Sequence, residues 1–128
     1  MSALLDTHAL IWFLTDDPHL SAKARELIEG EVRPLYLSSI VAVEVAIKYA
    51  LGKLHLPQPP RELIPKLLFE MRLTAIDFKL VHAGRLSELP RHHRDPFDRM
   101  LIAQALEERM SIVSADGVMP RYGVPVIW

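Results

Sequence analysis

The chain has 128 residues, of which 50% are hydrophobic and 24% are charged, so we expect one globular domain over residues 1–128. A net charge of −1 excludes a protein that coats nucleic acid by bulk positive charge, although local basic patches remain compatible with it. The absence of cysteine excludes disulfides and thiolate chemistry, and no apolar run is long enough to span a membrane, so a soluble, cytoplasmic protein is expected.

The N-terminal part of the chain alternates apolar runs with helical segments. Residues 3–5 are a continuous apolar run that predicts a buried strand, and residues 7–14 have helical spacing. Ser21 is positioned to cap a second helix, which Gly30 ends. Residues 35–37 then predict a second buried strand.

A long apolar helix is predicted after this second strand. Ser38 or Ser39 caps the helix, and it ends near Gly52. Because its sequence is apolar almost all round, we expect the helix to be largely buried. The prolines within residues 56–60 predict a loop, and residues 61–70 predict a helix with one internal proline.

The rest of the chain continues the alternation of strands and helices. In chain order, the predicted elements are a weak strand at 73–76, a helix at 80–89, a polar loop at 90–94, a helix at 96–109 and strands at 111–114 and 124–127. Strands that alternate with helices indicate an α/β fold, with a central, mainly parallel sheet in a three-layer α/β/α arrangement.

Acidic residues follow two of the predicted strands, at the edge of a parallel sheet where ligands bind. Asp6 follows the first strand, and Asp116 follows the strand at 111–114. Each also has a purely structural explanation. Asp6 is a good helix cap, and Asp116 followed by Gly117 is a common turn.

Three further acids lie on predicted helices or at the start of one. Glu44 lies within the apolar helix, where a carboxylate without a partner is costly, so it requires either Lys48 one turn later or a metal ion. Asp95, followed by proline, is an ordinary helix start. Asp98 occupies the third helical position, where an acid suits the helix dipole, and it flanks the apolar face of that helix.

Acids from four distant segments suit one particular chemistry. Mg²⁺ and Mn²⁺ prefer carboxylate oxygens, and such ions activate water for attack on a phosphodiester. The hypothesis is therefore a metal site built from Asp6, Glu44, Asp98 and Asp116. The six histidines show no zinc-type spacing, so none is assigned to a metal.

With these residues in view, the sequence resembles PIN domains, and more closely the VapC-type toxins of bacterial toxin–antitoxin pairs. The matching segments are residues 4–12, 39–48, 93–105, 114–116 and 122–128. The resemblance implies an endoribonuclease that depends on Mg²⁺ or Mn²⁺ and leaves a 5′-phosphate and a 3′-hydroxyl. It also implies that Asp6 and Asp98 are the primary metal ligands and that Glu44 and Asp116 complete the site.

Other residues are expected to support the acids or to contact RNA. By the resemblance, the supporting residues are Thr7, Ser39 and Asp95. The candidate RNA contacts are the basic residues near the acids: Lys48, Arg94 and Arg99. The resemblance further implies a homodimer and a cognate antitoxin that covers the active-site groove.

Three other functions are compatible with acids at strand ends. A non-catalytic α/β binding module, such as a receiver-like phosphoacceptor domain, would usually carry paired acids after the first strand and a lysine after a late strand, and neither pattern is evident. A phosphatase with an aspartate nucleophile would want a second acid two residues after Asp6, where His8 stands instead. A PIN-fold nuclease that processes RNA without being a toxin is the third alternative.

Overall fold

A computed structural model describes residues 2–30 and 34–128, and its elements alternate much as the sequence predicts. The strands are β1 (Ala3–Leu5), β2 (Leu35–Ser38), β3 (Thr74–Ile76), β4 (Ser111–Val113) and β5 (Val126–Ile127). The helices are α1 (Thr7–Leu14), α2 (Ala22–Glu29), α3 (Ser39–Ala50), α4 (Pro60–Glu70), α5 (Leu80–Leu86) and α6 (Pro96–Glu108), with a short 3₁₀ helix, η1 (Met119–Tyr122).

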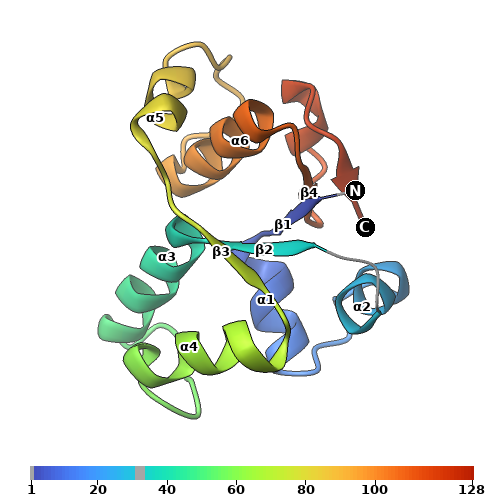
Figure 1. Ribbon diagram of the computed structural model, residues 1–128, viewed down its shortest axis with the longest axis vertical. Helices are drawn as coiled ribbons and strands as arrows, with labels where there is room; N and C mark the ends of the chain where they lie inside the picture. The colour runs from blue at the N-terminus through green and yellow to red at the C-terminus, as the bar shows by residue number, and fades with distance from the viewer. Residues whose placement is uncertain (1, 31–33) are drawn as a thin grey trace.

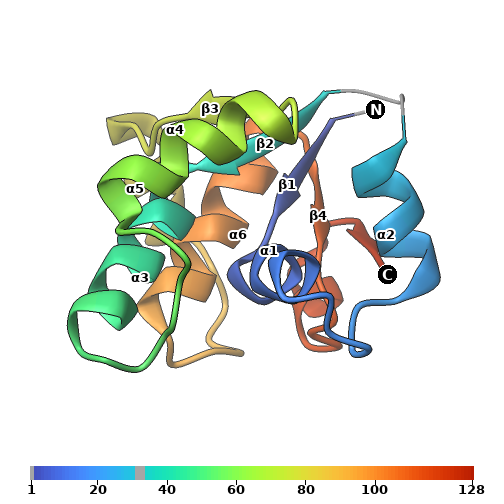
Figure 2. The same cartoon turned by 90° about the horizontal axis from the view of Figure 1, so that it is seen from below.

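The strands form one parallel sheet in the order β3-β2-β1-β4-β5. Helices α5 and α6 lie on one side of it, and α1 and α4 lie on the other (Figure 1). The orthogonal view places α1 and α4 in front of the strands and α6 behind them (Figure 2). The predicted α/β fold with a central parallel sheet between helical layers is therefore confirmed.

The central strands are buried on both faces, which explains their unbroken apolar sequences. Every side chain of β1 is inaccessible to solvent, as are Ile112 and Val113 of β4. Because all strands are parallel, their carboxyl ends meet at one edge of the sheet. Asp6 continues β1 at that edge, and its backbone N–H donates to Val113 O at 3.1 Å.

The helix starts follow the predicted capping chemistry. Ser21 caps α2 by accepting a hydrogen bond from Ala24 N. Ser38 caps α3, which decides between the two serines left open by the sequence. Asp95 caps α6 through Phe97 N, with proline at the first helical position.

Several predicted boundaries differ from the structure, most of them by one residue, and three of the differences have a clear physical reason. Strand β3 begins one residue late, because Leu73 N closes the end of α4 by donating to Leu68 O. Helix α5 ends at Leu86 rather than at residue 89, because the backbone N–H groups of residues 87–89 donate three residues back and form turns. Residue 89 also precedes Pro90, a position that disfavours helix. Strand β5 begins after Pro125, which has no N–H to contribute to a ladder.

The expectation that α3 is largely buried is wrong. Its side chains Val43 and Ile47 are 46% and 43% exposed, and Leu51 directly after the helix is 64% exposed, while Val41 and Val45 are buried. The helix contacts α1, α4 and α6, and these neighbours leave one of its sides open. An apolar surface therefore remains at this edge of the molecule.

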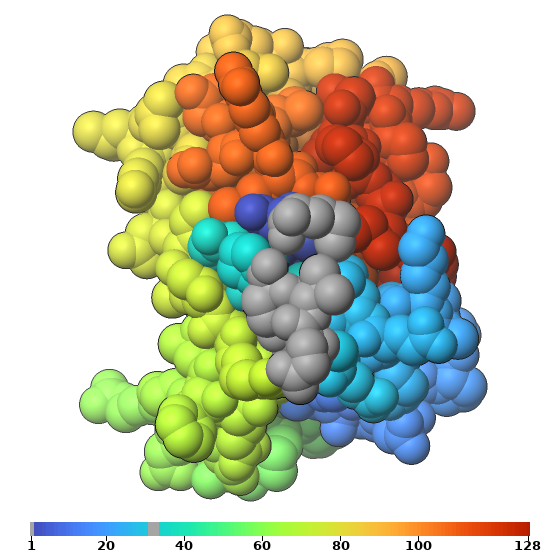
Figure 3. All heavy atoms as spheres, turned by 45° about the vertical axis from the view of Figure 1, so that its right-hand side comes forward, coloured from blue at the N-terminus to red at the C-terminus, as the bar shows by residue number. Residues whose placement is uncertain are grey.

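The C-terminal segment packs beside the N-terminal part of the chain. Figure 3 shows the C-terminal residues next to the segments of α1 and α2. The rings of Trp12 and Trp128 are 5.8 Å apart between centroids, and both pack against the hydrophobic core. Of the helices within the described residues, none is long and apolar enough to cross a membrane.

Candidate active site

Asp6 lies at the junction of β1 and α1. Its Oδ1 caps the helix by accepting a hydrogen bond from Ala9 N at 2.8 Å, and the residue is 7% exposed. Burial is the main influence on this carboxyl and raises its pKa, although hydrogen bonds from Ser114 and Ala9 oppose that effect. The cap uses only one of the two carboxylate oxygens, so Asp6 serves the helix and still faces the site.

Asp116 follows β4 within a turn, and the turn itself holds the carboxylate. Oδ1 accepts a hydrogen bond from Val118 N at 2.9 Å, and the backbone N–H of Asp116 donates to Ser114 Oγ at 3.0 Å. Partial burial by itself raises the pKa of Asp116, but hydrogen bonds from His93 and Val118 outweigh it, so the pKa is lowered. Because Ser114 also hydrogen-bonds Asp6, one buried hydroxyl joins the two strand-end acids.

Glu44 reaches the same edge of the sheet from α3. Its Oε1 accepts a 2.6 Å hydrogen bond from Thr7 Oγ1, and its Oε2 lies 2.7 Å from Lys48 Nζ. The residue is 6% exposed, so both oxygens are taken out of water and both have a partner. The structure thus provides the cation that a glutamate in this helix requires.

Asp98 lies in the first turn of α6, next to the capping Asp95. Within the described residues, no hydrogen bond or ion pair is formed by its carboxylate. Burial, followed by the negative charge of Asp95, raises the pKa of Asp98 to about 6; His93 lowers it, and Glu44 and Asp116 raise it further. Of the four acids, Asp98 is therefore the one whose charge is least compensated.

All four acids line one cavity of about 310 Å³. The other lining residues are Thr7, His8, Trp12, Lys48, Asp95 and Ala115. The structure therefore brings together the predicted acids with Thr7, Asp95 and Lys48. Ser39 does not line the cavity, because its hydroxyl accepts a hydrogen bond from Phe78 N at 2.9 Å.

The donor set of this cavity suits a hard divalent cation. Lys48 neutralises Glu44, but within residues 2–30 and 34–128 no lysine or arginine forms an ion pair with Asp6, Asp98 or Asp116. Several carboxylates that share a small cavity without enough positive charge repel one another, which is one reason for the raised pKa of Asp98. Mg²⁺ and Mn²⁺ take such oxygen ligands, so the residues present fit a metal site.

His93 is a residue of the site that the sequence reasoning did not assign. Its Nε2 lies 2.6 Å from Asp116 Oδ2, and its Nδ1 lies 2.9 Å from the hydroxyl of Tyr122. A single histidine in a polar loop has no diagnostic spacing, and its contact with Asp116 spans 23 residues. The only sequence signal is its place two residues before Asp95, in a segment already linked to the third acid.

A second, basic cleft of about 550 Å³ is formed by the segment between α5 and α6 and by the start of α6. Its lining residues are Leu86, Arg91, His92, His93, Arg94, Pro96 and Arg99. Arg91 and Arg94 are exposed and form no ion pair with any residue that the structure describes. His93 also contacts Asp116, so this cleft adjoins the acidic cavity.

The fold is similar to that of several solved structures. A structure of VapBC2 from Rickettsia felis bound to a promoter DNA fragment matches with a TM-score of 0.75 and 18% identity, over 98% of this chain and 97% of that chain. DNA-bound VapBC from Salmonella typhimurium matches with a TM-score of 0.73 and 21% identity, over 98% of this chain and 96% of that chain. A toxin–antitoxin complex from Klebsiella pneumoniae matches with a TM-score of 0.64 and 18% identity, over 98% of this chain and 96% of that chain.

At these identities the structural likeness concerns the fold. No curated protein matches the sequence at a significant level. The family model of the PIN domain, however, matches residues 3–125. Because that match spans nearly the whole chain, the protein belongs to the PIN domain family.

Proposed function

We propose that this protein is a metal-dependent endoribonuclease and the toxin of a type II toxin–antitoxin pair in the cytoplasm. The observation that carries the proposal is the convergence of Asp6, Glu44, Asp98 and Asp116 on one cavity at the carboxyl edge of the sheet. A receiver-like module or an aspartate phosphatase gives no reason for four acids from four separate elements to meet. Membership of the PIN domain family supports nuclease chemistry as well.

In this proposal, Asp6 and Asp98 are the primary ligands of Mg²⁺ or Mn²⁺, and Glu44 and Asp116 complete the site. When bound, such an ion lowers the pKa of water and stabilises negative charge on phosphate. The protein orients the ligands beforehand: Ala9 N and the Ser114 hydroxyl hold Asp6. Asp98 must give up its proton to serve as a ligand, and its raised pKa makes that step sensitive to pH.

Thr7 and Lys48 hold Glu44 from two sides and thereby fix its carboxylate at the cavity wall. Asp95 contributes negative charge beside Asp98 while it caps α6. RNA phosphates are attracted by the basic cleft next to the acids, where Arg94 and Arg99 lie. Lys48 is already paired with Glu44, so it is a weaker candidate for contact with RNA.

The toxin assignment draws on the similar structures, among which is a toxin–antitoxin complex from Klebsiella pneumoniae. VapBC assemblies from two other bacteria have the same fold as this chain over nearly its full length. A cognate antitoxin and a second copy of the chain in a homodimer are the proposed protein partners. The exposed apolar residues of α3 and Phe69 of α4 provide surface for such contacts.

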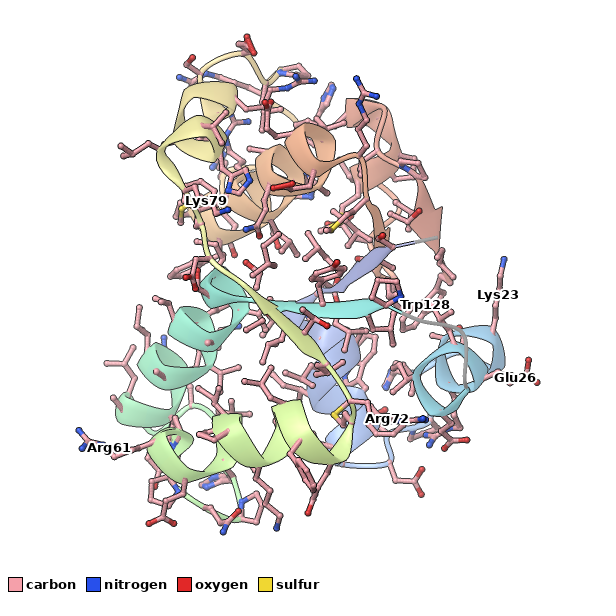
Figure 4. The ribbon with its side chains drawn as sticks, in the orientation of Figure 1. Lys23, Glu26, Arg61, Arg72, Lys79 and Trp128 are labelled. Carbon is pink, nitrogen blue, oxygen red and sulfur yellow. The ribbon has the colours of Figure 1, made fainter. Side chains whose placement is uncertain are left out.

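The test measures RNA cleavage by the purified protein and the growth of bacteria that express it. The wild type is compared with Asp6→Asn and Asp98→Asn. Glu26→Gln is the matched control, since Glu26 points into solvent from α2 (Figure 4). The two site variants should lose cleavage in Mg²⁺ or Mn²⁺ and should no longer arrest growth, while the control behaves as wild type. Full activity in both folded site variants would refute the four-acid mechanism. Cleavage without growth arrest would instead favour a PIN-fold nuclease that is not a toxin.

A further inference from the structure

The imidazole of His93 is held between the acidic site and η1. Its side chain is 10% exposed, and Nε2 lies 2.6 Å from Asp116 Oδ2. The ring stacks on Tyr122 with an interplanar angle of 24° and 5.4 Å between centroids. His93 is therefore fixed in position and orientation, with one ring nitrogen directed at the acids.

The other ring nitrogen of His93, Nδ1, has a partner that can form a hydrogen bond with either tautomer of the ring. Nδ1 lies 2.9 Å from the Tyr122 hydroxyl, whose oxygen accepts a hydrogen bond from His92 N at 3.1 Å. A hydroxyl is both a donor and an acceptor with two lone pairs. Tyr122 can thus donate to Nδ1 while Nε2–H donates to Asp116. Alternatively, Tyr122 accepts from Nδ1–H, which leaves the Nε2 lone pair free.

We propose that His93 is a nitrogen ligand of the same divalent ion that Asp98 and Asp116 bind. This inference rests on the metal dependence in the proposed function, and it adds a ligand of a different chemical kind. Ligand atoms of the three residues lie within 4.8 Å of one another. Two ligands that are each about 2.1 Å from one ion lie at most about 4.2 Å apart, so side-chain movements of less than about 1 Å are sufficient.

The surroundings of His93 have the pattern that metal-ligating histidines show. Such histidines form a hydrogen bond through the nitrogen that does not bind the metal, and this bond fixes the tautomer and the ring. Tyr122 provides that bond here, and the stacking adds a second restraint.

A nitrogen ligand has a consequence for metal choice. Imidazole suits transition metals, whereas Mg²⁺ prefers ligand sets made of oxygen. The site should therefore bind Mn²⁺ more tightly than Mg²⁺. In His93→Gln the difference between the two ions should shrink, because glutamine offers only an amide oxygen in place of the ring nitrogen.

The experiment is electron spin-echo envelope modulation spectroscopy of the whole protein, loaded with Mn²⁺ at saturating concentration. Wild-type protein should show modulation from a directly bound nitrogen, and isotope-labelled histidine should change its frequency. His93→Gln should lose this modulation and bind Mn²⁺ about tenfold or more weakly by calorimetry. His8→Ala is the matched control, because His8 lines the same cavity, and it should keep the modulation.

The outcomes separate this inference from the proposed function. If the wild type binds Mn²⁺ without nitrogen modulation, or if His8→Ala removes the modulation, His93 is not a ligand, although the nuclease proposal stands. If Mn²⁺ does not bind at all, both fail. Isotope labelling marks all six histidines, so it is combined with His8→Ala, which removes the histidine that lines the cavity. A labelled nitrogen signal that persists in His8→Ala supports His93 even if His93→Gln folds poorly.

Discussion

The ammonium of Lys48 lies 2.7 Å from Oε2 of Glu44, one turn away on the same helix. Because Thr7 occupies the other oxygen at 2.6 Å, Glu44 enters the site with both oxygens partnered. A metal ion must therefore compete with Lys48 for this carboxylate, whereas it meets no such competitor among the described residues at Asp98. From this contrast we expect Asp98 to be a more direct metal ligand than Glu44, and we expect Lys48 to stabilise the metal-free site.

Replacement of Lys48 by methionine should destabilise the metal-free protein, because the buried carboxylate of Glu44 loses its counter-ion. The loss should be only about 1–2 kcal/mol, since Lys48 is partly exposed and water already screens the ion pair. The gain in stability on adding Mn²⁺ should be larger than in the wild type, since the ion no longer competes with an ammonium. Urea denaturation with EDTA and with Mn²⁺ measures both effects. Lys23→Met, on the solvent side of α2, is the control (Figure 4). A variant that gains less from Mn²⁺ than the wild type would contradict this reasoning.

Asp98→Asn should stabilise the metal-free protein at about pH 7 while it abolishes cleavage. The raised pKa of Asp98 means that its ionised form is unfavourable in the folded, ion-free state. Asparagine removes that charge, so we expect a gain of about 1 kcal/mol after allowance for solvent screening, or about 3–6 °C in Tm. The measurement is the Tm in EDTA of the wild type, Asp98→Asn and the surface control Glu26→Gln. A loss of stability would show that the charge of Asp98 is compensated in solution.

The same pKa predicts how metal affinity depends on pH. Since the folded pKa of about 6 lies above the ordinary 3.8, the folded state retains its proton longer than the unfolded chain does. Ionisation of Asp98 therefore costs stability above about pH 6, and this cost disappears as the pH falls. Cation binding needs the ionised form, so the Kd for Mn²⁺ should rise about tenfold per unit below about pH 6. Calorimetry between about pH 5 and pH 8 tests this, and a Kd that does not change with pH over that range would contradict it.

The buried Gln104 is predicted to be a strong determinant of stability. Its Oε1 accepts a 2.5 Å hydrogen bond from Ser38 Oγ, and its Nε2 donates to Asp77 O at 3.1 Å. It thereby ties the carboxyl ends of β2 and β3 to α6. Gln104→Leu leaves the buried Ser38 hydroxyl without its acceptor and removes the donor to Asp77 O, so the loss should be about 1–3 kcal/mol. Denaturant unfolding of this variant, Ser38→Ala and the double variant would reveal coupling; strict additivity would exclude the proposed link.

The parts of this protein that depend on local sequence were predictable. Continuous apolar runs identified the strands, and capping residues such as Ser21 and Asp95 marked helix starts, because both signals act over a few residues. Burial of α3 was not predictable, since it depends on which neighbours surround the helix. His93 was missed for the same kind of reason: its partners Asp116 and Tyr122 come from another part of the chain.

Asp6 and Asp116 illustrate why a structural role and the proposed role in metal binding are compatible. Asp6 and Asp116 have the cap and the turn that their local sequences favour, and each uses one oxygen for that purpose. The local explanation was therefore correct, yet it did not account for the whole side chain. Only the order of the parallel strands, with β1 beside β4, brings these two residues together at the sheet edge.

We expect the basic cleft to bind the RNA backbone and to have no effect on the hydrolysis step itself. In the double variant Arg91→Ala, Arg94→Ala, KM for a long RNA should rise about tenfold and its dependence on salt should weaken, because two phosphate contacts are lost. Cleavage of a small phosphodiester such as bis-p-nitrophenyl phosphate should change less than about twofold, since that substrate is too short to reach the cleft. Arg61→Ala is the control, as Arg61 projects from α4 at the end of the molecule opposite α5 (Figure 4). If the double variant lost activity equally on both substrates, the cleft would act on the site itself and not on the RNA strand.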